Sequence, residues 1–134
     1  CLSSIMERPK RSRTKDLLEF EIAFYEQLLR EEPNFIDALR PLGEAYTRRG
    51  WHEKALAVDQ RLTQLRPEDS FAWYNAACSL ALLNRLEEAF ETLAHALALG
   101  YDDFEYLLKD PDLSALRRSP KLRQLLEQRL SSQR

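Results

Sequence analysis

The sequence has little glycine, proline or cysteine, and each shortage excludes a class of fold. Three glycines and six prolines among 134 residues leave few turn-forming positions for an all-β or loop-rich protein. Two cysteines, Cys1 and Cys78, do not make a disulfide framework, so the chain suits a reducing compartment. The abundant residues are leucine, alanine, glutamate and arginine, which all favour helices. We therefore expect an all-α protein.

Long apolar runs and a secretory signal are also missing. The longest weakly polar run, residues 76–83, is far shorter than the roughly 20 residues that span a membrane. We expect a cytoplasmic protein without a transmembrane segment. Cys1 leaves one alternative open, because a mature bacterial lipoprotein begins at a lipidated cysteine that tethers it to a membrane.

Charge is divided unevenly along the chain. Residues 1–15 carry five basic and one acidic side chain, residues 16–112 nine basic and twenty acidic, and residues 113–134 six basic and one acidic. The acidic body disfavours a nucleic-acid partner, which would need positive charge across its binding face. Residues 1–15 also lack an apolar period, and we expect them to form a disordered basic lead-in.

Motifs for catalysis, cofactors and metals are absent from the sequence. It contains no GxGxxG, GxxxxGK[ST] or HExxH pattern. His52 and His95 have no other histidine or cysteine at ligand spacing, and we interpret both as solvent-facing helix residues. Cys78 has no base partner nearby in the sequence, so we interpret it as a small buried or groove-lining residue. We expect no enzyme activity, cofactor, metal site or small-molecule substrate.

The clearest positive feature is a repeat with a period of 34 residues. Prolines recur at Pro33 and Pro67, and small or apolar residues recur at the same offset: Leu39 and Trp73, Gly43 and Ala77, Ala55 and Ala89, Leu65 and Leu99. Such a period is typical of stacked helix pairs. It predicts repeats at about 34–67 and 68–101, with helices near 35–49, 51–65, 70–83 and 86–99. Short connections make neighbouring helices antiparallel.

The segment before the repeats predicts one further helix. Asp16 and Glu19 have the spacing of a capping box, and apolar residues follow at helical spacing as far as residue 32. The expected helix, residues 16–32, is apolar around much of its circumference. We therefore expect other parts of the protein to cover it on more than one side. Together with the rest of the chain it forms one domain, residues 16–134.

The segment after the repeats predicts a differently built end. Tyr101 stands where a third proline would continue the period. Asp110 and Ser119 each precede a proline, which is the pattern of a cap residue before the first helical position. These pairs predict a short helix near 111–118 and another near 120–131. We expect a helical C-terminal cap over residues 102–132.

The order of small and large residues resembles the tetratricopeptide (TPR) repeat family. The segments that carry the resemblance are ALRPLGEAYTRRGWHEKALAVDQRLTQLRP and FAWYNAACSLALLNRLEEAFETLAHALALG. Small positions match Gly43, Ala55, Ala77 and Ala89, large positions match Leu39, Leu42, Tyr46 and Trp73, and closing prolines match Pro33 and Pro67. The tail is similar to the end of many bacterial and plant TPR proteins. The resemblance implies a right-handed α-solenoid of antiparallel helix pairs, with about two full repeats between flanking caps.

The resemblance also implies a function, because TPR proteins hold partner segments in a concave groove. Carried over by position, the groove residues are Asp37, Arg40, Glu44, Thr47, Arg48, Phe71, Tyr74, Asn75, Cys78 and Ala81. We expect a non-catalytic scaffold that binds a protein or peptide segment there. On this hypothesis Tyr74→Ala or Asn75→Ala abolishes binding without lowering thermal stability. The alternative is a self-associating structural module, a homo-oligomer that uses an open end of the stack.

One TPR subclass clamps a C-terminal carboxylate with basic and asparagine side chains from three repeats. Asn75 matches one of these asparagines, and Arg40 stands where a clamp lysine would be. Glu44 occupies the position of another required asparagine, and its negative charge would repel an anion. The sequence therefore disfavours a carboxylate clamp, and the identity of the partner stays open.

Overall fold

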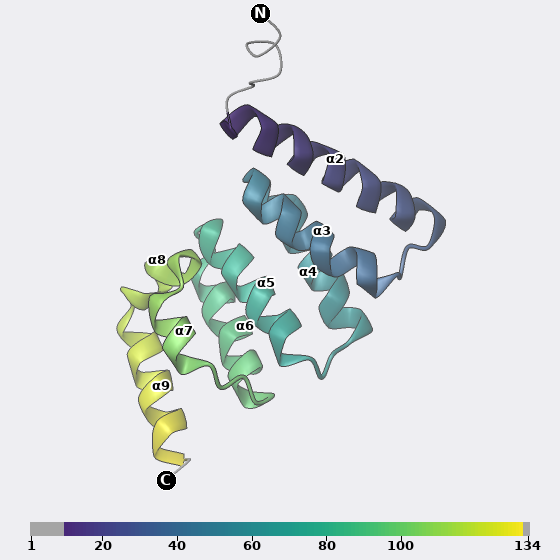
Figure 1. Ribbon diagram of the computed structural model, residues 1–134. Coiled ribbons are helices and arrows are strands. Elements are labelled where there is room, and N and C mark those ends of the chain that lie inside the picture. Colours follow the sequence, from purple (N-terminus) through teal and green to yellow (C-terminus); the bar gives the residue numbers. More distant parts are fainter. Residues whose placement is uncertain (1–9, 133–134) are drawn as a thin grey trace, which may run out of the picture.

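The computed structural model describes residues 10–132, and all regular elements in that range are helices (Figure 1). They are α2 (Lys10–Glu31), α3 (Ile36–Arg49), α4 (His52–Leu65), α5 (Ser70–Leu82), α6 (Leu86–Ala98), α7 (Phe104–Lys109), the 3₁₀ turn η1 (Pro111–Leu113), α8 (Ser114–Arg117) and α9 (Pro120–Ser132). From α2 to α6 each helix packs against the next. The fold is an α-solenoid of antiparallel helix pairs, with α2 at one end and α9 at the other.

The repeat predicted the four central helices closely because the turns between helices have clear local causes. Gly50 has a φ of 87° and ends α3, where its N–H and that of Trp51 bond the carbonyls of Thr47 and Tyr46. Asn84 (φ 60°) follows α5 and Gly100 (φ 108°) follows α6 in the same way. A left-handed residue at this position satisfies the last helical carbonyls, and glycine and asparagine adopt it at low cost.

The small repeat positions lie where helices approach one another closely. Ala55, Ala77 and Ala89 are fully buried. At Gly43 an added Cβ would lie 3.0 Å from Oδ1 of Asp59 and 3.2 Å from Cγ1 of Val58, so a larger residue would push α3 away from α4. The largest cluster of buried apolar residues joins α5 and α6 to the C-terminal elements, and smaller clusters join α2, α3 and α4.

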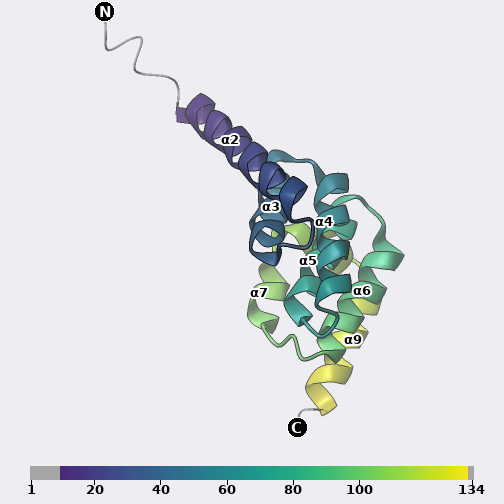
Figure 2. The same ribbon diagram turned by 90° about the vertical axis from the view of Figure 1, so that its right-hand side faces the viewer.

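Two expectations about the N-terminal helix are wrong. α2 begins at Lys10, not at Asp16, so residues 10–15 are helical rather than disordered, while residues 1–9 lie outside the described part. Lysine and arginine have good helix propensity, and a basic segment can therefore extend a helix that is anchored further on. The helix is also covered on one side alone by the described chain, since it packs on α3 and leaves large apolar side chains exposed. Figure 2 shows its N-terminal part projecting beyond the stack.

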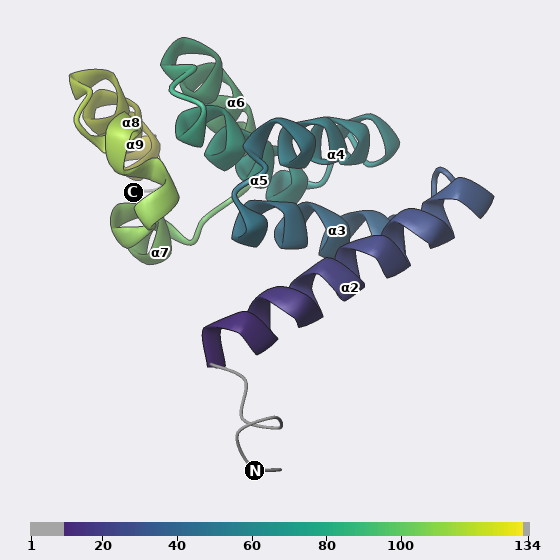
Figure 3. The same cartoon turned by 90° about the horizontal axis from the view of Figure 1, so that it is seen from above.

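The C-terminal end contains one helix that the sequence pattern missed. α7 (Phe104–Lys109) precedes the Asp110–Pro111 pair, and the expected helix at 111–118 is divided into η1 and α8. Asp103 caps α7 by accepting a hydrogen bond from the N–H of Tyr106, and Asp110 caps η1 in the same manner. We call residues 101–132 the closing segment. Figure 3 shows it on the side of the stack away from α2.

Candidate peptide-binding groove

Helices α3, α4 and α5 and the closing segment line a cavity of about 520 Å³, which we call the central groove. Its lining comes from α3, α4, α5 and the closing segment: Arg40, Pro41, Gly43, Glu44, Thr47, Arg48, Asp59, Leu62, Tyr74, Asn75, Cys78, Ser79, Leu82, Tyr106, Asp110 and Asp112. The first helices of both repeats thus contribute most of the lining. The second helix α4 and the closing segment supply its floor and inner end.

Seven of the ten residues proposed from the sequence lie together in this groove: Arg40, Glu44, Thr47, Arg48, Tyr74, Asn75 and Cys78. Three do not. Asp37 lines a separate surface depression, together with residues 32–36 and Arg66. Phe71 is exposed and places its ring edge-on against Tyr101, with 5.6 Å between the ring centroids. Ala81 is buried in the core.

The rim of the groove contains both paired and unpaired side chains. Arg40 forms an ion pair with Asp69, and Arg48 forms one with Glu21 of α2, with 3.1 Å between the nitrogen and the oxygen. Glu44 and Asn75 are exposed, and neither side chain makes a hydrogen bond or ion pair within the described chain. The groove therefore offers a carboxylate acceptor and an amide with both donor and acceptor capacity.

The floor of the groove contains a buried carboxyl group that the sequence did not reveal. Asp59 accepts a hydrogen bond of 2.7 Å from the hydroxyl of Ser79. Burial raises the pKa of Asp59 to about 7, although the hydrogen bond from Ser79 lowers it. This carboxyl group is therefore partly protonated near neutral pH. It was missed because Asp59 lies on the second helix of its repeat, and the resemblance pointed to first helices.

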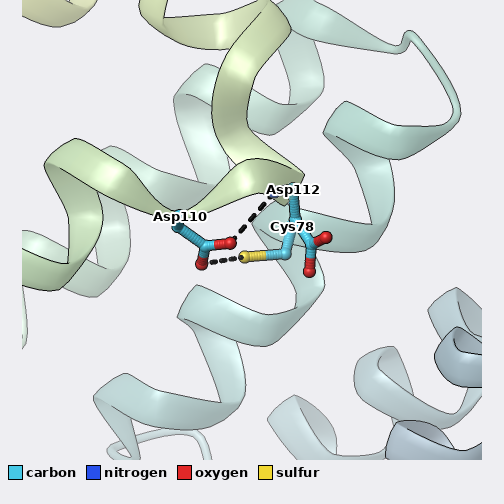
Figure 4. Close-up of side chains that lie close together, drawn as sticks. All are labelled: Cys78, Asp110 and Asp112. Carbon is cyan, nitrogen blue, oxygen red and sulfur yellow. Dashed lines mark hydrogen bonds between the residues drawn. The ribbon is translucent and has the colours of Figure 1, made fainter.

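The inner end of the groove is formed by a buried hydrogen-bond cluster around Asp110 (Figure 4). The Asp110 carboxylate accepts bonds from the hydroxyl of Tyr74 at 2.6 Å, from Sγ of Cys78 at 3.7 Å and from the backbone N–H of Asp112 at 3.0 Å. Burial and the charge of Asp110 raise the pKa of the Cys78 thiol, which therefore stays protonated and donates. The cluster attaches α5 to the closing segment.

Tyr74 has a structural role that the sequence did not predict. Its side chain is 4% exposed, and its ring stacks on Tyr101 with 4.2 Å between centroids and 5° between ring planes. Burial is also the main reason why the pKa of Tyr74 is raised. Tyr74→Ala would remove both the stack and the bond to Asp110, so the expectation that this change spares stability is wrong. Asn75 is exposed and remains a suitable position for testing binding.

Cys78, Asp110 and Asp112 also place their possible metal-ligating atoms within 4.8 Å of one another. Burial and the nearby charge of Asp110 raise the pKa of Asp112 as well. The sequence signal for this cluster was the Asp110–Pro111 pair, which we interpreted as a helix start alone. That interpretation is correct for the backbone, since Asp110 caps η1, but it did not place the side chain against α5.

The fold and the groove define a TPR-like helical repeat protein. No family model matches the sequence. The chain is 36% identical over 89 residues to a chloroplastic protein of Arabidopsis thaliana; the match covers 64% of this chain and 27% of that protein. The chain thus spans about a quarter of the length of this relative.

Solved structures support the same fold. The crystal structure of MamA aligns with a TM-score of 0.69 and 23% identity, covering 93% of this chain and 74% of MamA. A second structure, described as MamA MSR-1 C2, aligns with a TM-score of 0.61 and 18% identity over 86% and 71% of the two chains. At sequence identities this low, the two alignments show a similar fold and nothing further. Between residues 10 and 132, every helix is too short or too polar to cross a membrane.

Proposed function

We propose that this chain is a non-catalytic protein-interaction module that holds a partner segment in the central groove. The observation that carries the proposal is the unpaired state of Glu44 and Asn75, which project into the groove from the first helices of the two repeats. A carboxylate and an amide at such positions can bond the backbone and side chains of an extended segment. The protonated, buried thiol of Cys78 is a poor nucleophile, which supports a role in binding over one in catalysis.

The charges around the groove favour a basic partner segment. Arg40 and Arg48 are each neutralised by an acidic neighbour. Glu44 has no cationic partner within the described chain, and Asp110 and Asp112 add carboxylates at the inner end. A lysine or arginine of the partner would therefore meet a region of negative potential. An acidic segment would meet uncompensated repulsion.

Binding of a single segment should be modest, with dissociation constants of about 1–100 µM, because ordering a flexible peptide offsets much of the contact free energy. A displayed library of random peptides of about 15 residues, selected on the 134-residue protein, tests the proposal. We expect the selected peptides to be enriched in lysine and arginine. Their binding should weaken at least about tenfold in a Glu44→Lys, Asn75→Ala double variant.

A matched control separates groove binding from general attraction to an acidic protein. Glu91 lies on α6, is exposed and does not line the groove, so Glu91→Lys makes the same charge change elsewhere. Its peptide affinity should stay within about twofold of wild type. Peptides that bind the double variant as tightly as the wild type, or a selection without basic enrichment, would contradict the proposal.

A further inference from the structure

One face of α2 carries large apolar side chains that the described chain leaves uncovered. Leu17, Phe20 and Phe24 lie at helical spacing on this face, with exposed fractions of 69%, 72% and 51%. Ile22, on the face that packs against α3, is 4% exposed. We call the three exposed residues the α2 stripe. It spans about 10 Å along the helix, and a contiguous apolar surface of this kind marks an interaction site.

The opposite end of the solenoid carries an apolar depression between α7 and α9, which we call the terminal groove. Its volume is about 320 Å³, and its lining is Phe104, Leu108, Arg117, Leu122, Arg123, Leu126, Glu127 and Leu130. Leu122 and Leu126 are buried and form its floor. Leu108 and Leu130 are 59% and 46% exposed. The depression therefore has an apolar floor and apolar walls that remain open.

We propose that the α2 stripe of one copy docks in the terminal groove of the next copy, so that chains associate head to tail. The stripe is convex, because Leu17, Phe20 and Phe24 project from a single helix, whereas the terminal groove is concave. The two surfaces lie at opposite ends of the solenoid (Figures 1 and 3), so one molecule cannot bring its own surfaces together. Each docking would cover one exposed stripe and one exposed groove.

The charges beside the two surfaces have opposite signs, which favours a second copy as the occupant. Residues 16–31 of α2 carry five acidic and one basic side chain, of which Glu19 and Glu21 pair with arginines of α3, whereas residues 113–134 carry six basic and one acidic. Arg117, Arg123 and Glu127 lie at the terminal groove itself, so its lining has more basic than acidic side chains. Opposite potentials attract the copies and fix their order.

A head-to-tail contact has a specific thermodynamic consequence. Because the two contacting surfaces differ, every added copy presents a new free stripe or a new free groove. The mean mass should therefore rise continuously with concentration, and association should weaken as salt screens the charges. Pairing of two α2 helices about a two-fold axis would instead stop at the dimer and leave the terminal groove open.

Two single substitutions, one on each surface, test the proposal in the whole chain. Phe20→Lys places a like charge against the basic end, and Leu108→Glu places a like charge against the acidic flank of the stripe. Both positions are exposed, so the fold should tolerate either change. By sedimentation equilibrium from about 5 to 500 µM, each variant should associate at least about tenfold more weakly than wild type.

Mixing the two variants gives the decisive measurement. The intact groove of Phe20→Lys can accept the intact stripe of Leu108→Glu, and each of the two remaining surfaces has lost an apolar side chain that the contact needs. We expect the mixture to form pairs of one chain of each variant and nothing longer. Formation of that pair also demonstrates that both variants are folded. Phe71→Lys, which changes an exposed aromatic residue on neither surface, should associate like the wild type.

Three results would overturn the proposal. The first is a wild-type chain that stays monomeric over the whole range of concentration. The second is a Leu108→Glu variant that still dimerises while Phe20→Lys does not, which would indicate pairing of α2 with α2. The third is failure of the variants to pair when mixed, with circular dichroism showing both folded; if either is unfolded, Phe24→Lys and Leu130→Glu replace them. None of these measurements depends on a partner in the central groove.

Discussion

The hydroxyl of Tyr74 donates a hydrogen bond of 2.6 Å to the carboxylate of Asp110, although the two residues are 36 positions apart. This bond joins the first helix of the second repeat to the closing segment. The thiol of Cys78 and the backbone N–H of Asp112 reach the same carboxylate. Because Asp110 is buried, these donors replace the water that would otherwise solvate its charge. These hydrogen bonds therefore add to the apolar contacts that join the closing segment to α5 and α6.

Tyr74→Phe should destabilise the protein by about 1.5–3 kcal/mol, because it removes a donor to a buried charged group and leaves the ring stack with Tyr101 in place. Urea denaturation followed by circular dichroism measures the change. Tyr106→Phe is the matched control, since Tyr106 is 45% exposed and its loss of a hydroxyl should cost less than about 0.5 kcal/mol. Equal stabilities of the two variants would contradict the structural role of the Tyr74 hydroxyl.

Asp59 should make the protein less stable as the pH rises from about 4 to about 7. Its pKa in the folded state, about 7, lies above the ordinary value of 3.8, so the folded protein binds the proton more tightly than the unfolded chain. The stabilisation from this group is complete below pH 4 and is lost as the pH passes the folded pKa. Asp59→Asn keeps a group that can bond Ser79 and removes the charge.

The asparagine variant should therefore be more stable than the wild type at pH 8, by about 1–4 kcal/mol, with the difference shrinking toward pH 4. Denaturant titrations of both proteins at several pH values give the difference directly. Other carboxyl groups titrate in both proteins and cancel in the comparison. A difference in stability that does not change between pH 4 and pH 8 would mean that Asp59 has an ordinary pKa.

Gly43→Ala should destabilise the protein by about 1–3 kcal/mol even though alanine has the higher helix propensity. The new Cβ would lie 3.0 Å from Oδ1 of Asp59 and 3.2 Å from Cγ1 of Val58, and both atoms belong to the packed face of α4. Thermal unfolding measures the effect. Ser70→Ala, at the half-buried first residue of α5, is the comparison for an ordinary change of one small side chain. A Gly43→Ala variant more stable than the wild type would show that α4 can move away at no cost.

The sequence predicted the central helices well because both repeats pack in the same way and therefore need small and large side chains at the same positions. Leu39, Ala55 and Ala89 are buried in clusters between helices of the same or adjacent repeats, so the same residue types return every 34 positions. The turns at Gly50 and Gly100 were predictable for an equally local reason, because both positions have positive φ angles, which glycine adopts at low cost. The start of α2 was missed because basic residues tolerate a helix without specifying one.

The candidate site was predicted less completely, because its inner half depends on contacts distant in sequence. Glu44 and Asn75 were found through their position on first helices. Tyr74 and Cys78 do line the groove, but the closing segment that buries them has no counterpart in the repeat. Phe71 was expected to line the groove, and the ring of Tyr101 holds it outside. No periodic signal could have predicted these contacts.

Asp110 also limits how many units this architecture can hold. It accepts a hydrogen bond from Tyr74 once, at the end of the second repeat. A longer array made by duplicating residues 68–101 would contain an inner copy of Tyr74 with no Asp110 beside it, and its hydroxyl would be buried without that acceptor. The two repeats are thus not interchangeable modules: the first could be copied, whereas the second is built to be last.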